Sequence, residues 1–479
     1  MTATIELRNP RTGQSDGTIL PTTVDELTDA AQRLRTSQPA WSALGVDGRA
    51  DALRRWKDAC NVRRESIIAA LANDTGRMRE SIQEFEAFVG SIERWASLAP
   101  KLLAENRRFT STLGFIDIDK NFRPYQLAGI ISPWNFPLIL STIDMLPAVM
   151  AGSAVLLKPS EVTPRFVSPL RDALNEVPEL ASVFEIVLGN GTVGAQMIPL
   201  VDLVCFTGSV PTGRKVGAAA AAQFIPAFLE LGGKDPAIVL AGADLDHASN
   251  ALLWGATSNA GQACQSIERI YVEASVHDEF VELLSRKAAR IGLCYPTYDR
   301  PGLGPIIAER QIQTIENQLA DALDKGAVIQ TGSSEVEHHG GGAWVRITVL
   351  TAMTHDMDMM REETFGPFLP VMAFSDVDQA VKLANDSPFG LSAAVFAASS
   401  DEAEAVARRL DVGAVSVNDA TLTALVWEGE KHSFKWSGLG GSRMGPASLF
   451  RFLRSQALLI KTDPSVHDPW WYPAEEPPR

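Results

Sequence analysis

The sequence predicts an α/β fold with two open parallel sheets covered by helices on both faces. The main observation is that short apolar runs, typical of buried strands, alternate with helix-like runs in two series, over residues 126–229 and 236–418. The 479 residues are enough to bury large cores in two or three domains. A content of 46% apolar and 21% charged residues is ordinary for a globular protein.

The segment before the first series has a helical pattern. Apolar residues recur at helical spacing in residues 24–35, 49–72 and 77–98, opposite charged faces. The Asp74-Thr75-Gly76 stretch is expected to end the second of these helices. Residues 106–122 alternate in polarity and predict a β-hairpin that turns at Leu113-Gly114.

The strands of the two series are short runs bounded by turn residues. The first series places them at 126–131, 153–157, 184–188, 203–206 and 227–229. The second places them at 236–240, 269–272, 328–331, 344–350, 369–373, 393–397 and 413–418. The tail, 464–479, is too rich in proline for a helix, and we expect an extended strip packed on a neighbour.

Charge and cysteine content exclude several classes of protein. A net charge of −15 and a pI near 5.0 argue against a nucleic-acid surface or an anionic membrane partner. The four cysteines show no metal-ligand spacing, and His338-His339 is interpreted as a solvated turn, so no metal is expected. The longest apolar stretch, 138–157, contains Asp144 and Pro147 and does not predict a membrane span. With no secretory signal visible, a cytoplasmic protein is expected.

Candidate ligand-binding residues follow the predicted strands, because open parallel sheets bind ligands at their carboxyl edge. Asn135 lies in a loop stiffened by prolines, where it can donate to an oxyanion or make an Asx turn. Lys158 and Glu161 can grip ribose hydroxyls or form a surface ion pair. Gly208 and Ser209 open a helix whose N-terminus suits a phosphate.

Two further residues are candidates for chemistry. Glu230, beside a Gly-Gly pair, suits a general base, or alternatively a salt bridge to Lys234. Cys264 lies between a helical run and a strand-like run, and is either a nucleophile or a small buried residue. The GxGxxG pattern at 189–194 is interpreted as a turn rather than a dinucleotide fingerprint.

Together these segments resemble the aldehyde dehydrogenase superfamily, in its NAD(P)-dependent, hydrolytic type, from about residue 27 to 459. The resemblance rests on seven blocks in the family's order and spacing: Pro133-Trp134-Asn135-Phe136-Pro137, Lys158-Pro159-Ser160-Glu161, Phe206-Thr207-Gly208-Ser209, Glu230-Leu231-Gly232-Gly233-Lys234, Gly261-Gln262-Ala263-Cys264, Glu362-Glu363-Thr364-Phe365-Gly366-Pro367 and Ser437-Gly438-Leu439-Gly440.

The resemblance implies roles for individual residues. Cys264 matches the nucleophile, Asn135 the oxyanion-hole residue and Glu230 the base that activates water. The cofactor residues that it implies are Ser132, Trp134, Lys158, Glu161, Gly208, Ser209, Leu231, Glu363 and Phe365. The implied reaction is oxidation of an aldehyde to a carboxylic acid through a hemithioacetal and a thioester. NAD is the expected cofactor, with NADP possible, because Glu161 would repel a 2′-phosphate.

The resemblance also implies an architecture. It has two Rossmann-like domains, one for NAD (1–104 and 124–231) and one catalytic (232–435), with a small β oligomerisation arm (105–123 and 452–463). The C-terminal strand of the arm is expected to pair with the hairpin across subunits, in a homodimer or homotetramer.

The chain departs from the family pattern around the aldehyde tunnel. Glu430-Lys431-His432-Ser433 replaces the usual Pro-Phe-Gly-Gly, the stretch from Asn418 is about two residues longer, and the 440–445 segment lacks the usual acidic residue. An apolar tunnel is predicted, suited to aromatic or longer aliphatic aldehydes, from Phe136, Ile143, Ala263, Gln265, Trp427 and Phe434. The alternatives are a semialdehyde dehydrogenase acting on a small charged aldehyde, a catalytically silent structural relative, and a cysteine (thio)esterase.

Overall fold

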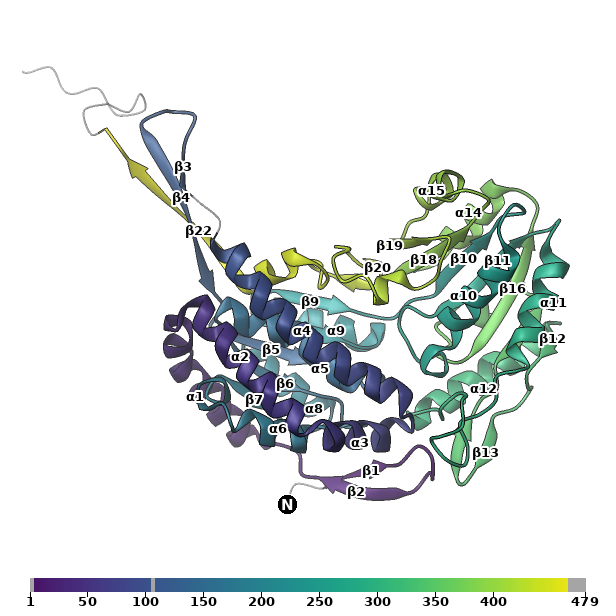
Figure 1. Ribbon diagram of the computed structural model, residues 1–479, viewed down its shortest axis with the longest axis horizontal. Helices are drawn as coiled ribbons and strands as arrows, with labels where there is room; N and C mark the ends of the chain where they lie inside the picture. The colour runs from purple at the N-terminus through teal and green to yellow at the C-terminus, as the bar shows by residue number, and fades with distance from the viewer. Residues whose placement is uncertain (1–3, 105–107, 464–479) are drawn as a thin grey trace, which may run out of the picture.

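The computed structural model describes residues 4–104 and 108–463 (Figure 1). The predicted extended tail, 464–479, and the first residues of the predicted hairpin lie outside the described residues. In the described chain, no helix combines the length and apolar character needed to cross a membrane.

The chain opens with a β-hairpin that the sequence analysis missed. Strands β1 (Ile5–Arg8) and β2 (Ser15–Ile19) pair antiparallel. They escaped notice because β2 is short and largely exposed, so its side chains carry no apolar alternation. The turn between them is fixed by Arg11, whose guanidinium donates to the carbonyls of Gly76 at 2.9 Å and Cys294 at 2.8 Å.

Four helices follow, where three were predicted. They are α1 (Val24–Ala43), α2 (Gly45–Val62), α3 (Arg64–Thr75) and α4 (Arg79–Ala104). The predicted helix 49–72 is divided because Arg63 leaves helical geometry, at φ −101° and ψ 15°. As the sequence predicts, α3 ends at Gly76, which adopts the left-handed cap conformation at φ 71°.

The first sheet has the order β21-β9-β8-β5-β6-β7. Its parallel strands are β5 (Leu127–Ile131), β6 (Ala154–Lys158), β7 (Phe184–Ile186), β8 (Leu203–Thr207) and β9 (Ala227–Glu230). The edge strand β21 (Gly438–Leu439) returns from the far end of the chain and pairs antiparallel with β9. The intervening helices are α5 (Pro137–Ala151), α6 (Val167–Leu174), α7 (Pro178–Ala181), α8 (Gly191–Met197) and α9 (Val210–Ala222).

The second sheet has the order β12-β15-β16-β11-β10-β18-β19. Its strands are β10 (Asp235–Val239), β11 (Ile267–Glu273), β12 (Val328–Thr331), β15 (Thr348–Thr351), β16 (Phe368–Phe374), β18 (Ser392–Phe396) and β19 (Ala414–Val417). Helices α10 (Leu245–Thr257), α11 (His277–Ala288), α12 (Glu309–Asp324), α13 (Asp358–Arg361), α14 (Val377–Asn385) and α15 (Ser400–Ala407) accompany it.

The predicted α/β architecture of two mainly parallel open sheets is confirmed, with β12 pairing antiparallel with β15 at the edge of the second sheet. Two local expectations for this half were wrong. The predicted strand 344–350 is two strands, since β14 (Gly342–Trp344) leaves the sheet to pair with β13 (Glu337–His339). His338-His339 therefore lies in a strand rather than a loop tip.

The predicted hairpin extends from the body as an arm (Figure 1). It consists of β3 (Arg108–Thr110), β4 (Ile116–Pro124) and β22 (Leu453–Lys461) in the order β22-β4-β3. The expectation that β22 pairs across subunits was wrong. It pairs antiparallel with β4 of its own chain, from Leu453 opposite Pro124 to Lys461 opposite Ile116, which occupies the whole of β4.

Candidate active site

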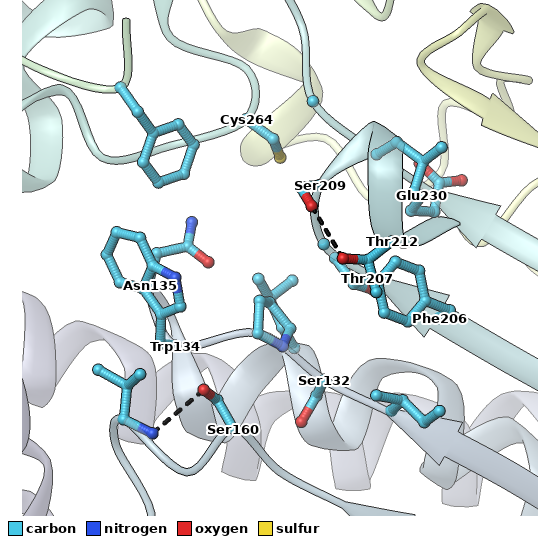
Figure 2. Close-up of a pocket in the computed structure, with 18 of the residues that line it drawn as sticks. Ser132, Trp134, Asn135, Ser160, Phe206, Thr207, Ser209, Thr212, Glu230 and Cys264 are labelled. Atoms are coloured by element: carbon cyan, nitrogen blue, oxygen red, sulfur yellow. Dashed lines mark hydrogen bonds between the residues drawn. The ribbon is translucent and has the colours of Figure 1, made fainter. Parts of the chain in front are cut away.

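A cleft of about 270 Å³ opens at the carboxyl ends of β5, β6, β8 and β9 and brings together residues from both halves of the chain (Figure 2). The first half supplies loops that the sequence analysis singled out, and the second supplies Cys264, Glu363 and Phe365. Every catalytic and cofactor residue that the sequence suggested lines this cleft, namely Ser132, Trp134, Asn135, Lys158, Glu161, Gly208, Ser209, Glu230, Leu231, Cys264, Glu363 and Phe365.

The thiol of Cys264 is positioned by an unusual turn that follows α10. Asn259, Ala260 and Gly261 are all left-handed, at φ 54°, 54° and 72°. An added Cβ at Gly261 would lie 2.2 Å from the carbonyl oxygen of Gly366, so only glycine fits there. The two non-glycine residues store strain that the surroundings must offset. Nothing in the sequence motif signals this left-handed run.

Hydrogen bonds hold the turn in place. The Asn259 side chain donates to the carbonyls of Asn135 and Gln262, both at 3.0 Å. The Gln262 side chain donates to Asn259 O at 3.0 Å and accepts from the N–H of Ile307 at 2.8 Å. The loop of Cys264 is thereby tied to the loop of Asn135, and the two side chains point into the same space (Figure 2).

Asn135 is only 4% exposed and rigidly held. Its Nδ2 donates to Gln262 O at 3.0 Å, and its own main-chain carbonyl also accepts from Arg77 at 2.5 Å. An amide nitrogen has two N–H donors, so one remains for a ligand in the cleft. This geometry can stabilise an oxyanion on a carbon bonded to Cys264.

Glu230 ends β9, and its carboxylate accepts a hydrogen bond from the Ser433 hydroxyl at 2.8 Å. The alternative salt bridge to Lys234 is wrong, because Lys234 donates instead to Glu268 at 2.6 Å and to Thr364 at 2.9 Å. The Glu230 carboxylate is therefore not tied up in an ion pair with Lys234 and can accept a proton from a ligand in the cleft. The partner hydroxyl of Ser433 was missed by the sequence analysis, which noted its segment only as a departure from the family pattern.

The electrostatics of the cleft act strongly on Cys264. Burial raises the pKa of its thiol to about 12, and the charge of Lys431 opposes that rise. Glu363, Glu230 and Asp235 raise the pKa of Cys264 further. Burial likewise raises the pKa of Glu363 to about 8, helped by the charge of Glu268. Protonated Glu363 accepts from the N–H of Gly233 at 3.1 Å and can also donate to a ligand.

The rest of the cleft suits a dinucleotide. Helix α9 starts at the cleft with no side-chain cap on its N-terminus, where Gly208, Ser209 and Thr212 line the wall, so its N–H groups can take a phosphate. Lys158 donates to Gly189 O at 2.7 Å and lies 3.5 Å from Glu161, placing a donor and an acceptor side by side. Trp134 and Phe365 meet edge to face at 5.4 Å and form an apolar wall.

The predicted apolar tunnel is not part of this cleft, since none of its six residues is among the lining. Trp427 is 8% exposed and packs edge-on against Trp95 at 5.3 Å, inside the core of the first half. Phe434 is 40% exposed on the short strand β20 (Phe434–Lys435), which pairs with β17 (Phe389–Gly390). Of the other four, Phe136 has the Arg77 guanidinium over its ring and Ile143 lies on α5. Ala263 and Gln265 are the chain neighbours of Cys264 but do not line the cleft.

The fold and the cleft thus define a class of α/β protein in which a cleft suited to a dinucleotide also contains a cysteine thiol. A model of the aldehyde dehydrogenase family matches residues 1–458, and the chain belongs to that family. It is an oxidoreductase family that acts on aldehydes and uses NAD or NADP.

Individual relatives agree. A protein of Mycolicibacterium smegmatis, provisionally named succinate-semialdehyde dehydrogenase (NADP(+)), is 34% identical over 95% of this chain and 89% of its own length. The provisionally named aldehyde dehydrogenase PutA of Anabaena variabilis is 55% identical with a TM-score of 0.97, covering 98% of this chain and 100% of that one. Betaine aldehyde dehydrogenase of Staphylococcus aureus, solved with NAD+, is 29% identical with a TM-score of 0.91, covering 98% and 94%.

Proposed function

We propose that this protein oxidises an aldehyde to a carboxylic acid with NAD(P)+ by forming and hydrolysing a thioester on Cys264. The observation that supports it most is that these groups line one cleft. Cys264, Asn135 and Glu230 share it with the uncapped N-terminus of α9, which can bind a phosphate, and with the Lys158–Glu161 pair. No single residue supports the assignment as strongly as this combination.

The proposed chemistry starts with addition of the Cys264 sulfur to the aldehyde carbon. The C=O π bond opens, the oxyanion forms beside the Asn135 amide, and the thiol proton passes to solvent water. A hydride then leaves that carbon, which converts the hemithioacetal to a thioester. When bound, the nicotinamide ring accepts this hydride.

Hydrolysis completes the cycle. Glu230 takes a proton from water, whose oxygen attacks the thioester carbon, and the C–S bond breaks to release the acid and restore the sulfur. The bond from Ser433 aims the carboxylate and can shift as the proton arrives. A carboxylate at this position favours water over coenzyme A as the acceptor, and it also argues against a catalytically silent relative.

The cofactor side separates the proposal from a cysteine (thio)esterase. An esterase needs Cys264 and Asn135, but it has no use for Lys158, Glu161 or the uncapped start of α9. We propose NAD as the preferred cofactor, because the Glu161 carboxylate beside Lys158 accepts from a ribose hydroxyl and repels a 2′-phosphate.

Two substrate classes remain as candidates. Aromatic or longer aliphatic aldehydes were favoured by the sequence, but the cleft beside Cys264 is not lined by the aromatic residues that suggested them. The second candidate is a short charged semialdehyde, the class in the name of the Mycolicibacterium smegmatis relative. We also propose the division into a cofactor domain and a catalytic domain that the sequence suggests. The arm is proposed to form a homodimer or homotetramer, because it exposes an apolar side chain, Leu459, to 69%.

The experiment is to follow the absorbance of the reduced cofactor with purified protein and a panel of aldehydes, using NAD and NADP in parallel. Wild type should reduce NAD faster than NADP. Cys264→Ala should abolish reduction, because no thioester can form. Cofactor reduction that survives in that variant would refute the mechanism, and hydrolysis of esters without reduction by wild type would point to the esterase.

A further inference from the structure

A buried ion pair lies behind the loop that carries Asn135. Arg77 comes just before α4 and Glu84 lies near the start of that helix, and their side chains are 4% and 1% exposed. Arg77 Nη2 is 3.6 Å from Glu84 Oε2. Neither residue is among those that line the cleft. Any effect of the pair on a reaction must therefore pass through other residues.

The pair is energetically unfavourable as it stands. Nε and Nη1 of Arg77 and Oε2 of Glu84 are sealed from solvent, and in the described part of the chain these three atoms make no hydrogen bond. Burial raises the pKa of Glu84 to about 7 and lowers the pKa of Arg77, because the charged form of each is disfavoured there. An apolar pair of similar volume is often at least as stable. The presence of the ion pair therefore indicates a role other than stability.

The other atoms of the pair contact the Asn135 loop at both of its ends. Arg77 Nη2 donates to the main-chain carbonyl of Asn135 at 2.5 Å, and its guanidinium lies 4.6 Å from the centroid of the Phe136 ring. Glu84 Oε1 accepts from the N–H of Leu138 at 2.6 Å. This bond caps the first turn of α5, whose own N-cap residue supplies no side-chain hydrogen bond. The main chain is thus fixed before and after the loop turns into α5.

The carbonyl of Asn135 also connects the pair to the loop of the nucleophile. Asn135 O accepts from Asn259 Nδ2 at 3.0 Å, and the side chains of both asparagines donate to Gln262 O at 3.0 Å. Arg77 is itself held, since its main-chain carbonyl accepts from the Ser81 hydroxyl at 2.6 Å. A fixed main chain fixes the direction of the Cα–Cβ bond. The direction of the Asn135 amide therefore depends on Arg77 from one side and on Asn259 from the other.

We propose that Arg77 and Glu84 are positioning residues for the oxyanion site. They fix the main chain around Asn135 so that the free N–H of its amide points to the oxygen of the bound substrate. This inference rests on the proposed function and adds two residues to it. An oxyanion forms when the sulfur adds to the aldehyde and again when water adds to the thioester, so both steps depend on this alignment. A displacement of about 1 Å in such a group can lower a rate by about 100-fold.

The first variant, Arg77→Met, removes the donor to Asn135 O. With the enzyme in excess over the aldehyde, cofactor reduction reports formation of the thioester, and it should slow by about 10- to 100-fold. Alkylation of Cys264 by iodoacetamide forms no oxyanion, so its rate should stay within about 2-fold of wild type. Arg79→Met, the same change at an exposed residue two positions on, should match wild type in both assays.

A second variant separates positioning from a loss of stability. Arg77→Met leaves Glu84 buried without its cation, so the melting temperature should fall. Arg77→Met/Glu84→Gln removes both charges while the glutamine oxygen can still accept from Leu138, so the melting temperature should recover. Cofactor reduction should stay at least about 10-fold slower than in wild type, because Asn135 O still lacks the Arg77 donor. Recovery of the rate together with the melting temperature would overturn the proposal and make the pair purely structural.

The route through Asn135 is tested by placing Arg77→Met/Glu84→Gln in an Asn135→Ala background. If the pair acts through the Asn135 amide, the added changes should alter the remaining rate by less than about 3-fold. A fall as large as in the wild-type background would overturn the proposal, as would a wild-type rate in Arg77→Met itself, and the proposed function would stand in both cases. No cofactor reduction by wild type with any aldehyde would refute the proposed function instead.

Discussion

At the scale of the residue, the thiol of Cys264 is protonated in the protein without ligands. Burial raises its pKa to about 12, and Glu363 and Glu230 add to the rise. Because only the thiolate is a strong nucleophile, attack requires a partner that removes the proton or a cation that stabilises the sulfur. The charge of Lys431 opposes the rise in the pKa of Cys264 and so favours the thiolate.

This gives a pH prediction. A thiol with a pKa near 12 has a thiolate fraction that rises about tenfold for each unit between pH 7 and 10. Inactivation of the cofactor-free protein by iodoacetamide should therefore accelerate across that range without levelling, while neutral Lys431→Met should react more slowly at every pH. A rate that levels off below pH 9 would show that the thiol ionises far more easily than its burial implies.

At the scale of the element, the turn over residues 259–261 decides where the sulfur lies. Its three left-handed residues are held by the side chains of Asn259 and Gln262 and by the close approach of Gly366 to Gly261. The turn links the oxyanion residue to the nucleophile, so a fault here should affect stability and catalysis together.

Gly261→Ala should destabilise the protein by at least about 2 kcal/mol, since the left-handed backbone costs about 1 kcal/mol for a residue with a Cβ and overlap with Gly366 adds to it. Urea unfolding measures the loss. Gly90→Ala is the matched control, because Gly90 lies inside α4 with no atom within 4 Å of an added Cβ; it should be neutral or stabilising. Equal stability of Gly261→Ala and wild type would contradict the assigned strain.

At the scale of the whole molecule, the site exists only because two sheets meet. The parallel strands and the loops after them were predicted well, because buried strands have continuous apolar runs and their loops carry compact motifs such as 133–137. The family also follows from these motifs, and residues far apart in the sequence, such as Asn135 and Cys264, line one cleft.

What the sequence could not supply depends on tertiary contacts. Strand β22 pairs with β4 of the same chain, and no local sequence pattern encodes that pairing. Trp427 looked like a tunnel wall by composition, but it packs on Trp95. In the sequence, Lys431 and Ser433 were noted only as departures from a family pattern. The burial of Lys431 and the hydrogen bond from Ser433 to Glu230 depend on the fold.

The central claim is that Cys264 is acylated and that Glu230 activates the water that releases the acid. The most direct measurement is a rapid-mixing experiment with Glu230→Gln, NAD and an aldehyde substrate, followed by mass spectrometry of the protein. We expect one burst of reduced cofactor, about one per active site, no steady turnover, and an acyl group on Cys264. Steady turnover at the wild-type rate, or a burst without acylation of Cys264, would contradict the account.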